Sequence, residues 1–181
     1  MKKILKILEA GQLILAPTDT IWGILCDATN PRAINKVYDL KKRSDSKAMV
    51  CMVSDIEMLE KHVDDLPEKI EDFINDQRPT TIIYKAPKGI AENAIAKENT
   101  VAIRIVNHHF CTPLITAFGR PLISTSANIS GNPHPQKFSD ITDDILNGVD
   151  YIAEIDQYKN NPQPSRIIKI EPSGEIFLLR A

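Results

Sequence analysis

Residues 1–17, MKKILKILEAGQLILAP, join a helical pattern to the pattern of a buried strand. Ile4, Leu5 and Leu8 recur at helical spacing, and Gly11 is placed to end the helix. The apolar run that follows, residues 13–17, is typical of a short strand buried on both faces. A helix that leads directly into a buried strand indicates the α/β class.

The same mixture of helices and strands continues along the chain. Asn30 is placed to cap a helix that starts at Pro31, and Ser54 with Glu57 three residues later predicts a capping box for the next helix. Further helices are predicted within residues 67–76, 108–119 and 138–148. Strands are predicted within residues 48–53, 80–86, 100–106, 121–125 and 150–155, and two more within 165–180 around a Pro-Ser-Gly turn. This order predicts a mixed β-sheet.

Composition limits the classes of function. The 181 residues are 43% hydrophobic with a net charge of −2, which fits one domain with a substantial core and gives no general attraction to nucleic acid or anionic membranes. An odd number of cysteines without a C-x-x-C pair indicates neither a disulfide framework nor a zinc site. The first 17 residues lack the apolar length of a membrane span and the cleavage pattern of a signal peptide. We therefore expect a cytoplasmic protein.

Four polar segments beside predicted strands are the candidates for chemistry. The chain has no P-loop, dinucleotide-binding or nucleophile-elbow motif, so a phosphate site would depend on side chains. The segments are PTDT (17–20), KKRSDSK (41–47), TVAIRI (100–105) and STSANIS (124–130). Each also has a structural interpretation: a capped turn, a solvated basic helix end, an arginine on an edge face and a tight turn, respectively.

The arginine in TVAIRI has the clearest chemical potential of these groups. Strand geometry puts Val101, Ile103 and Ile105 on one face and Ala102 and Arg104 on the other. A guanidinium held in a cleft suits a carboxylate or a phosphate, because its planar fork of donors matches their oxygens.

Five motifs in a fixed order resemble one enzyme family. APTDTIWGILCDA, LKKRSDSKAM, TVAIRI, PLISTSANISG and PSRII resemble the YrdC-like threonylcarbamoyl-AMP synthases, with K-x-R and S-x-N as the most specific part. The resemblance runs from about Gly11 to Arg180. It implies a single YrdC-like domain over residues 1–181, with a twisted mixed β-sheet and flanking helices around a concave, locally basic cleft.

The resemblance also implies an activity. Such a nucleotidyltransferase joins L-threonine, bicarbonate and ATP into threonylcarbamoyl-AMP and releases pyrophosphate, with Mg²⁺ bridging the phosphate oxygens. The threonylcarbamoyl group then passes to tRNA, which implies transient contact with a transferase machinery and possible contact with tRNA. No membrane partner is expected.

Residue roles follow from the same resemblance, motif by motif. The catalytic set is Lys41, Arg43, Ser126 and Asn128. The ATP-binding set is Arg43, Lys47, Thr100, Ser126, His134 and Arg180. The threonine-binding set is Thr20, Arg104, Ser124 and Ser165. The chain departs from the family pattern at DQRPTT (76–81), where W-P-G-P-x-T is usual, at His134 in place of a small hydroxyl and at Ser44 in place of a proline.

Two other functions fit the same fold. One is a paralogue without synthase activity that binds double-stranded RNA or the ribosome, and the other is a hydrolase of acyl or carbamoyl phosphates. The retained K-x-R and S-x-N, and an aromatic content of only 6%, favour the synthase over an RNA binder. The adjacent His108 and His109 lack the spacing of paired metal ligands on a helix, so no metal ligand is assigned. Trp22 could line the cleft or fill the core.

Overall fold

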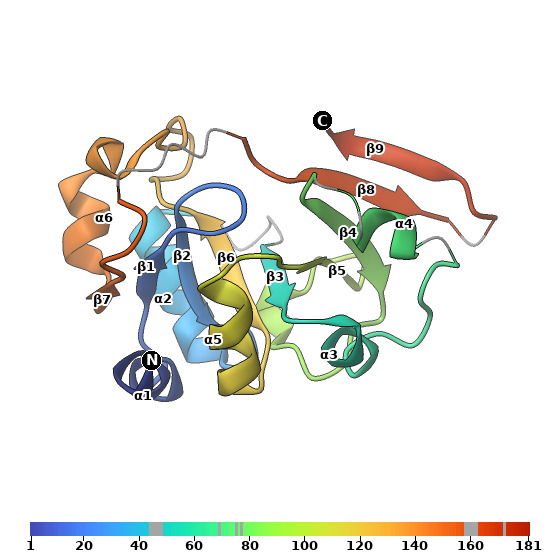
Figure 1. Cartoon of the computed structure of the whole chain (residues 1–181), viewed down its shortest axis with the longest axis horizontal. Coiled ribbons are helices and arrows are strands. Elements are labelled where there is room, and N and C mark those ends of the chain that lie inside the picture. The colour runs from blue at the N-terminus through green and yellow to red at the C-terminus, as the bar shows by residue number, and fades with distance from the viewer. Residues whose placement is uncertain (44–48, 69, 75, 77, 158–162, 172) are drawn as a thin grey trace.

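The strands form one mixed sheet in the computed structural model, which describes all residues except 44–48, 69, 75, 77, 158–162 and 172 (Figure 1). The strand order is β7-β1-β2-β6-β3-β5-β4-β8-β9. The strands are β1 Ile14–Ala16, β2 Gly23–Asp27, β3 Val50–Val53, β4 Thr80–Lys85, β5 Thr100–Ile105, β6 Leu122–Ser126, β7 Tyr151–Ile152, β8 Arg166–Ile170 and β9 Ile176–Arg180. The predicted mixed α/β fold is confirmed.

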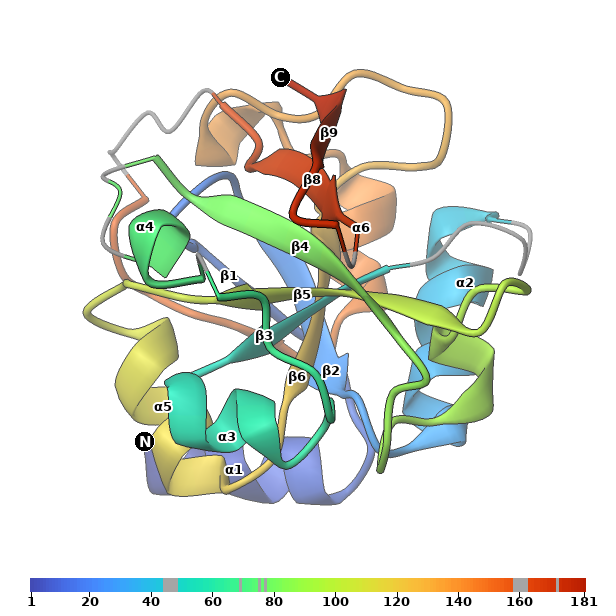
Figure 2. The same cartoon turned by 90° about the vertical axis from the view of Figure 1, so that its right-hand side faces the viewer.

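Helices flank the sheet and are short. They are α1 Lys2–Glu9, α2 Pro31–Lys41, α3 Ile56–Glu60, α4 Ile70–Ile74, α5 Cys111–Phe118 and α6 Asp143–Gly148, with 3₁₀ turns η1 Glu92–Ala94 and η2 Phe138–Asp140. Figure 2 shows α2 lying apart from α1, α3 and α5, with central strands of the sheet between them. Within the described ranges, no helix combines the length and the apolar character needed to cross a membrane.

Helix ends follow the predicted signals with two exceptions. The helix predicted within residues 138–148 is divided into the 3₁₀ turn η2 and the helix α6. Asn30 caps α2, since its side chain accepts from the amides of Arg32 and Ala33. The capping box predicted at Ser54 is wrong, because the Asp55 carboxylate accepts from the Met58 amide and begins α3 one residue later. A serine hydroxyl and an aspartate carboxylate can each accept from an amide in the first turn of a helix, and the ionised carboxylate is the stronger acceptor.

Strand β2 is the main element that the sequence did not predict. It lies between β1 and β6 and is antiparallel to both. Its five residues are all buried, which places it in the middle of the molecule.

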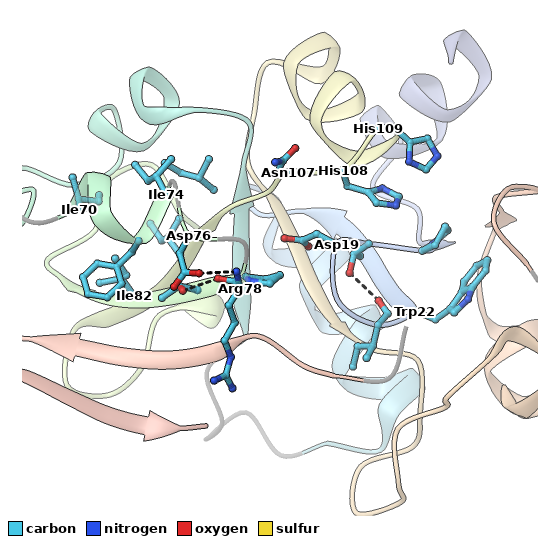
Figure 3. Close-up of a pocket in the computed structure, with 18 of the residues that line it drawn as sticks. Asp19, Trp22, Ile70, Ile74, Asp76, Arg78, Ile82, Asn107, His108 and His109 are labelled. Atoms are coloured by element: carbon cyan, nitrogen blue, oxygen red, sulfur yellow. Dashed lines mark hydrogen bonds between the residues drawn. The ribbon is translucent and has the colours of Figure 1, made fainter. Parts of the chain in front are cut away.

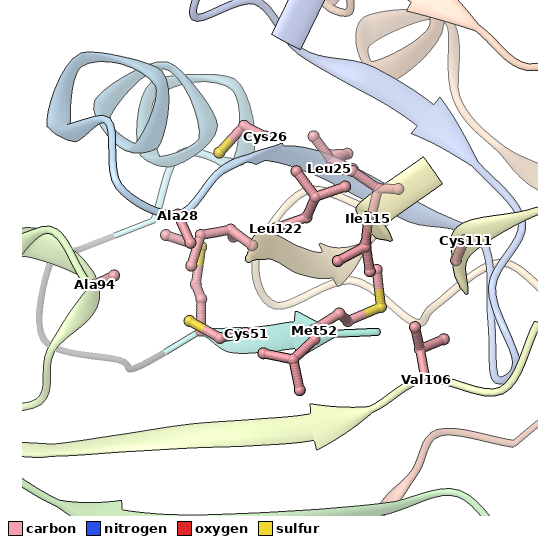
Figure 4. Packing of buried hydrophobic residues seen from close by; sticks show 14 of the residues in the cluster. Leu25, Cys26, Ala28, Cys51, Met52, Ala94, Val106, Cys111, Ile115 and Leu122 are labelled. Atoms are coloured by element: carbon pink, nitrogen blue, oxygen red, sulfur yellow. The ribbon is translucent and has the colours of Figure 1, made fainter. Parts of the chain in front are cut away.

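The hydrophobic core contains residues from most of the chain, from Ile4 near the N-terminus to Ile168 of β8. Ile115 of α5 belongs to the same buried cluster as Leu25, Met52 and Leu122, which come from three different strands (Figure 4). These contacts fix the strand order and therefore the position of each loop that follows a strand.

Candidate active site

Three predicted site residues share one face of the sheet. Ser124 and Ser126 lie two residues apart on β6, so their side chains point to the same side. Met52 is paired with Leu122 of β6 and with Arg104 of β5, which puts Arg104 on that side as well. The sheet therefore presents two hydroxyls and one guanidinium on a single face.

Arg104 is almost fully enclosed, with 4% of its surface exposed. Its Nη2 atom donates to Asp19 Oδ1 at 3.0 Å and approaches Thr20 Oγ1 at 3.5 Å. Its Nε–H group is buried and has no hydrogen-bond partner among the described residues. The alternative interpretation of an arginine on an edge face does not hold, because β5 lies between β3 and β4. Arg104 thus has a donor available for a ligand oxygen.

Asp19 is a charged neighbour that the sequence prediction did not include. Burial raises the pKa of Asp19, while the Arg104 guanidinium and the amide of Asn107 act in the opposite direction. The ion pair between Asp19 and Arg104 is buried on both sides, so each charge depends on the other. The sequence did contain a sign of this role, because Asp19 is the acidic residue of PTDT and precedes Thr20, which the resemblance assigned to threonine binding.

A second group of residues connects a predicted threonine position with a predicted ATP position. Ser165 Oγ lies 2.8 Å from Thr81 Oγ1 and accepts from Arg180 Nη2 at 3.1 Å. Arg180 Nε also donates to the Ser165 carbonyl at 2.9 Å. Burial lowers the pKa of Arg180, and the nearby charge of Arg104 lowers it further. Two guanidinium groups therefore face the same region, which is locally basic.

The K-x-R and S-x-N motifs meet at the end of α2. Lys41 is 2% exposed, and its Nζ atom donates to the Ser126 carbonyl at 2.5 Å, the Asn128 carbonyl at 2.6 Å and Asn128 Oδ1 at 3.1 Å. The Lys41 carbonyl accepts from the Ser130 amide at 2.9 Å. Arg43 Nη1 lies 3.4 Å from Thr125 Oγ1. Lys41 thus holds the loop that follows β6 through both its side chain and its backbone.

Asn128 is fixed at both ends of its amide. Its Oδ1 atom accepts from Ser126 Oγ at 2.5 Å as well as from Lys41, and its Nδ2 atom donates to the Asn132 carbonyl at 2.5 Å. A side chain that is held in this way keeps one orientation without a bound ligand, and such preorganisation favours catalysis.

The remaining predicted positions are less closely connected. Lys47 lies outside the described residues. Thr100 begins β5, four residues before the arginine, which is about 13 Å along a strand. His134 is partly exposed in the loop beyond β6. Ser124 lies close to Gly23, where an added Cβ would be 3.0 Å from Ser124 Oγ, so glycine leaves space beside this hydroxyl.

A cavity of about 360 Å³ opens beside Asp19, the ion-pair partner of Arg104, and the predicted site residues described above are not among those that line it (Figure 3). Its walls include Asp19, Trp22 and Asn107, and the strand residues Ile82 and Ile103, which lie on the opposite face of the sheet from Arg104. Trp22 satisfies both interpretations given above: it is 2% exposed, belongs to the core and also lines the cavity.

The unusual DQRPTT segment forms part of the cavity wall. Asp76, Arg78 and Pro79 line the cavity, and the Asp76 carboxylate pairs with the Arg166 guanidinium at 2.5 Å. Asp76 Oδ1 also accepts from the Arg78 backbone amide at 3.0 Å. Two charged residues, Asp76 and Arg78, therefore stand where the family pattern has an aromatic residue and a glycine.

Comparison with known proteins identifies the family. The profile of the Sua5/YciO/YrdC family, described as telomere recombination, matches residues 6–181. The chain belongs to this family. It is 37% identical to a putative threonylcarbamoyl-AMP synthase of Methanocaldococcus jannaschii, over 94% of this chain and 82% of that protein. It is 30% identical to the threonylcarbamoyl-AMP synthase of Acinetobacter baumannii, over 94% of this chain and 93% of the relative.

Solved structures of family members share the fold. The P. abyssi Sua5 complex with L-threonine superposes with a TM-score of 0.85 at 23% identity, covering 99% of this chain and 53% of Sua5. E. coli YciO superposes with a TM-score of 0.81 at 20% identity, covering 98% of this chain and 86% of YciO. The chain thus spans about half the length of the solved Sua5 and most of YciO.

Proposed function

We propose that this protein is a threonylcarbamoyl-AMP synthase, which forms threonylcarbamoyl-AMP and pyrophosphate from L-threonine, bicarbonate and ATP. The observation that carries the proposal is the direct contact between K-x-R and S-x-N, in which Lys41 binds Ser126 and Asn128. The names of the full-length relatives support the same activity.

The ATP side of the site would work mainly through positive charge. Arg43, Lys47 and Arg180 are cations that can bind the triphosphate. The Ser126 hydroxyl donates its one proton to Asn128 Oδ1, so it would have to turn away from that oxygen to donate to a phosphate oxygen. The predicted ATP positions include no carboxylate, so Mg²⁺ would be held through phosphate oxygens and water, which is its common mode of binding. When bound, Mg²⁺ would offset the charge on the leaving pyrophosphate.

Lys41 is better suited to positioning than to direct phosphate binding. A protonated amine has three N–H groups, and the three from Lys41 are directed at oxygens of the S-x-N loop. The lysine would hold Ser126 and Asn128 where the carbamate of threonine meets the α-phosphate. Holding the reactants in line is the main requirement of this chemistry.

The threonine side would use Arg104 for the substrate carboxylate. Its Nε–H has no partner in the part of the chain that the structure describes, and Thr20 lies beside its guanidinium. A carboxylate oxygen bound there would meet a positive charge and a hydrogen-bond donor. Ser124 and Ser165 would add hydroxyl contacts. The structure of P. abyssi Sua5 with L-threonine shows that a protein of this fold binds the amino acid.

The test is pyrophosphate release from ATP by the purified full chain. We expect release only when threonine and bicarbonate are both present, and we expect Arg43→Ala to reduce it by about 100-fold or more, because a partly buried cation assigned to the phosphates is lost. Release that continues without threonine would contradict the synthase and favour the phosphate hydrolase. Absence of release, together with RNA binding, would favour the paralogue without synthase activity.

The ionisation of Lys41 predicts a pH dependence. Burial lowers the pKa of Lys41 to about 7 from its ordinary 10.5, and Arg43 contributes in the same direction. A neutral amine has two N–H groups for three oxygens, so we expect pyrophosphate release to fall as the pH rises through about 7. Lys41→Arg, which stays protonated, should move this decline to higher pH.

An adjacent lysine provides the control for that measurement. Lys42 is exposed, and Lys42→Arg should keep the wild-type pH profile. If pyrophosphate release falls over the same pH range in Lys41→Arg and in the wild type, the fall is caused by the ionisation of another group.

The proposed activity also bears on the domain organisation, the partners and the location of the protein. Residues 1–181 would form one YrdC-like domain, which the single buried cluster supports. Because the threonylcarbamoyl group passes on to tRNA, the protein would make transient contact with a transferase machinery and would meet tRNA there. A cytoplasmic location stays a prediction, and the three free, buried thiols are compatible with it.

A further inference from the structure

Two histidines and an aspartate converge beside the cavity, apart from the residues assigned above. Asp156 Oδ2 lies 3.1 Å from His109 Nε2 and 3.8 Å from His108 Nε2. One ligand atom from each of the three residues lies within 4.8 Å of the other two. Asp156 follows β7, more than forty positions after the histidines, so only the fold brings the three together.

The backbone explains how adjacent histidines reach one point. On a helix, neighbouring side chains diverge by about 100°, which is why their adjacency argued against metal binding. Both histidines precede α5, which begins only at Cys111. Their rings lie 4.4 Å apart between centroids, tilted by 47°. The spacing rule for helices therefore does not apply to this pair.

We propose that His108, His109 and Asp156 form a binding site for a divalent transition metal of the Zn²⁺ class. Ligand atoms about 2.1 Å from a tetrahedral ion lie about 3.4 Å from one another. The observed separations of 3.1 and 3.8 Å from the aspartate oxygen lie on either side of this value. Only the gap between the imidazoles has to close, and the 59% exposed His109 side chain can move to close it.

The donor set selects the kind of metal. Two imidazole nitrogens with one carboxylate oxygen suit Zn²⁺, Co²⁺ or Ni²⁺, whereas Mg²⁺ prefers oxygen ligands. This site would therefore be distinct from the Mg²⁺ that accompanies ATP. Three protein ligands leave a fourth position open, as in sites where zinc also binds water or a substrate oxygen.

The surroundings of the cluster allow an ion to enter and to be retained. The side chains of His108 and Asp156 are only 12% and 15% exposed, whereas His109 reaches solvent. His108 and His109 stand at the edge of the cavity that also holds Asp19 and Asn107 (Figure 3). The open position of the metal would therefore face the cavity, where an oxygen ligand could complete the coordination.

Metal binding at this site would compete with protons. Without a metal, the Cys111 amide donates to His108 Nδ1 at 3.4 Å, a long hydrogen bond, so the ring proton of His108 lies on Nε2, on the side of Asp156. Ligation through His108 Nε2 puts the proton on Nδ1 and ends that bond. A metal ligates only an imidazole nitrogen that carries no proton, so affinity for the metal should fall as the solution is acidified.

The experiment is metal binding by the full chain after removal of any affinity tag, with Zn²⁺ measured by equilibrium dialysis and Co²⁺ by its visible spectrum. We expect one saturable site without the charge-transfer band of a thiolate ligand. His109→Ala and Asp156→Asn should each weaken binding by about tenfold or more. His62→Ala is the matched control, because His62 is partly exposed and contacts the Lys88 carbonyl instead.

Three results would overturn the site. These are the absence of saturable binding at neutral pH, His109→Ala with wild-type affinity, and a thiolate band that assigns the metal to a cysteine. Since His109 is largely exposed, its removal should leave the melting temperature without metal near that of wild type, so loss of binding would not reflect unfolding. The readout is binding alone, and its outcome does not depend on synthase activity.

Discussion

Asn128→Ala is expected to reduce pyrophosphate release by about 100-fold or more, the typical cost of losing a preorganised polar group at a reacting centre. The substitution removes the oxygen that accepts from both Lys41 and Ser126, and the nitrogen that donates to the Asn132 carbonyl. Ser126 then loses its fixed orientation, and the loop loses the link between its two ends. The decrease should appear in the rate at saturating ATP and threonine, because alignment of the reactants is lost.

A neighbouring asparagine controls for a general effect on the loop. Asn132 is exposed, and the contact to Asn128 uses its backbone carbonyl, so Asn132→Ala should retain nearly all activity. Thermal unfolding would establish that the Asn128→Ala protein is folded. Release near the wild-type rate in folded Asn128→Ala would contradict the role assigned to this amide.

Local patterns predicted most of the secondary structure, because cap residues and apolar periodicity act over a few positions. Asn30 with Pro31 predicted the start of α2, and Gly119 ends α5 with a φ of +70°. Strand β2 was missed because it begins with a glycine and ends with an aspartate, two residue types that are uncommon in strands, and because it follows closely after the polar residues of PTDT. Its strand character comes from pairing with β1 and β6, which is a long-range effect.

The candidate site was predicted as residue types but not as contacts. The resemblance selected Lys41, Ser126 and Asn128, yet a basic run at a helix end gave no sign that Lys41 would be buried and committed to protein oxygens. Contacts between residues far apart in sequence could not be read from spacing. The same limit applies to Asp156, which reaches the histidines only after β7 has paired with β1.

Arg104→Ala is expected to destabilise the fold, by about 3–5 kcal/mol in the free energy of unfolding, because it leaves a buried carboxylate without its partner. The pKa of Asp19 is already raised by burial, and loss of the guanidinium should raise it further. A raised pKa in the folded state means that stability is lost as the pH rises through that pKa. Urea unfolding should therefore show a larger deficit at about pH 7 than near pH 4.

The double variant Asp19→Asn with Arg104→Gln separates this structural effect from substrate binding. It removes both charges together, so much of the lost stability should return, since no unpaired charge remains in the core. Threonine should still bind weakly, because its carboxylate has no cation to meet. A loss of about 2 kcal/mol is about 30-fold in affinity, and it should raise the threonine concentration needed for half-maximal pyrophosphate release while leaving that for ATP nearly unchanged. Equal losses for ATP and threonine would mean that Arg104 shapes the whole site rather than binding the amino acid.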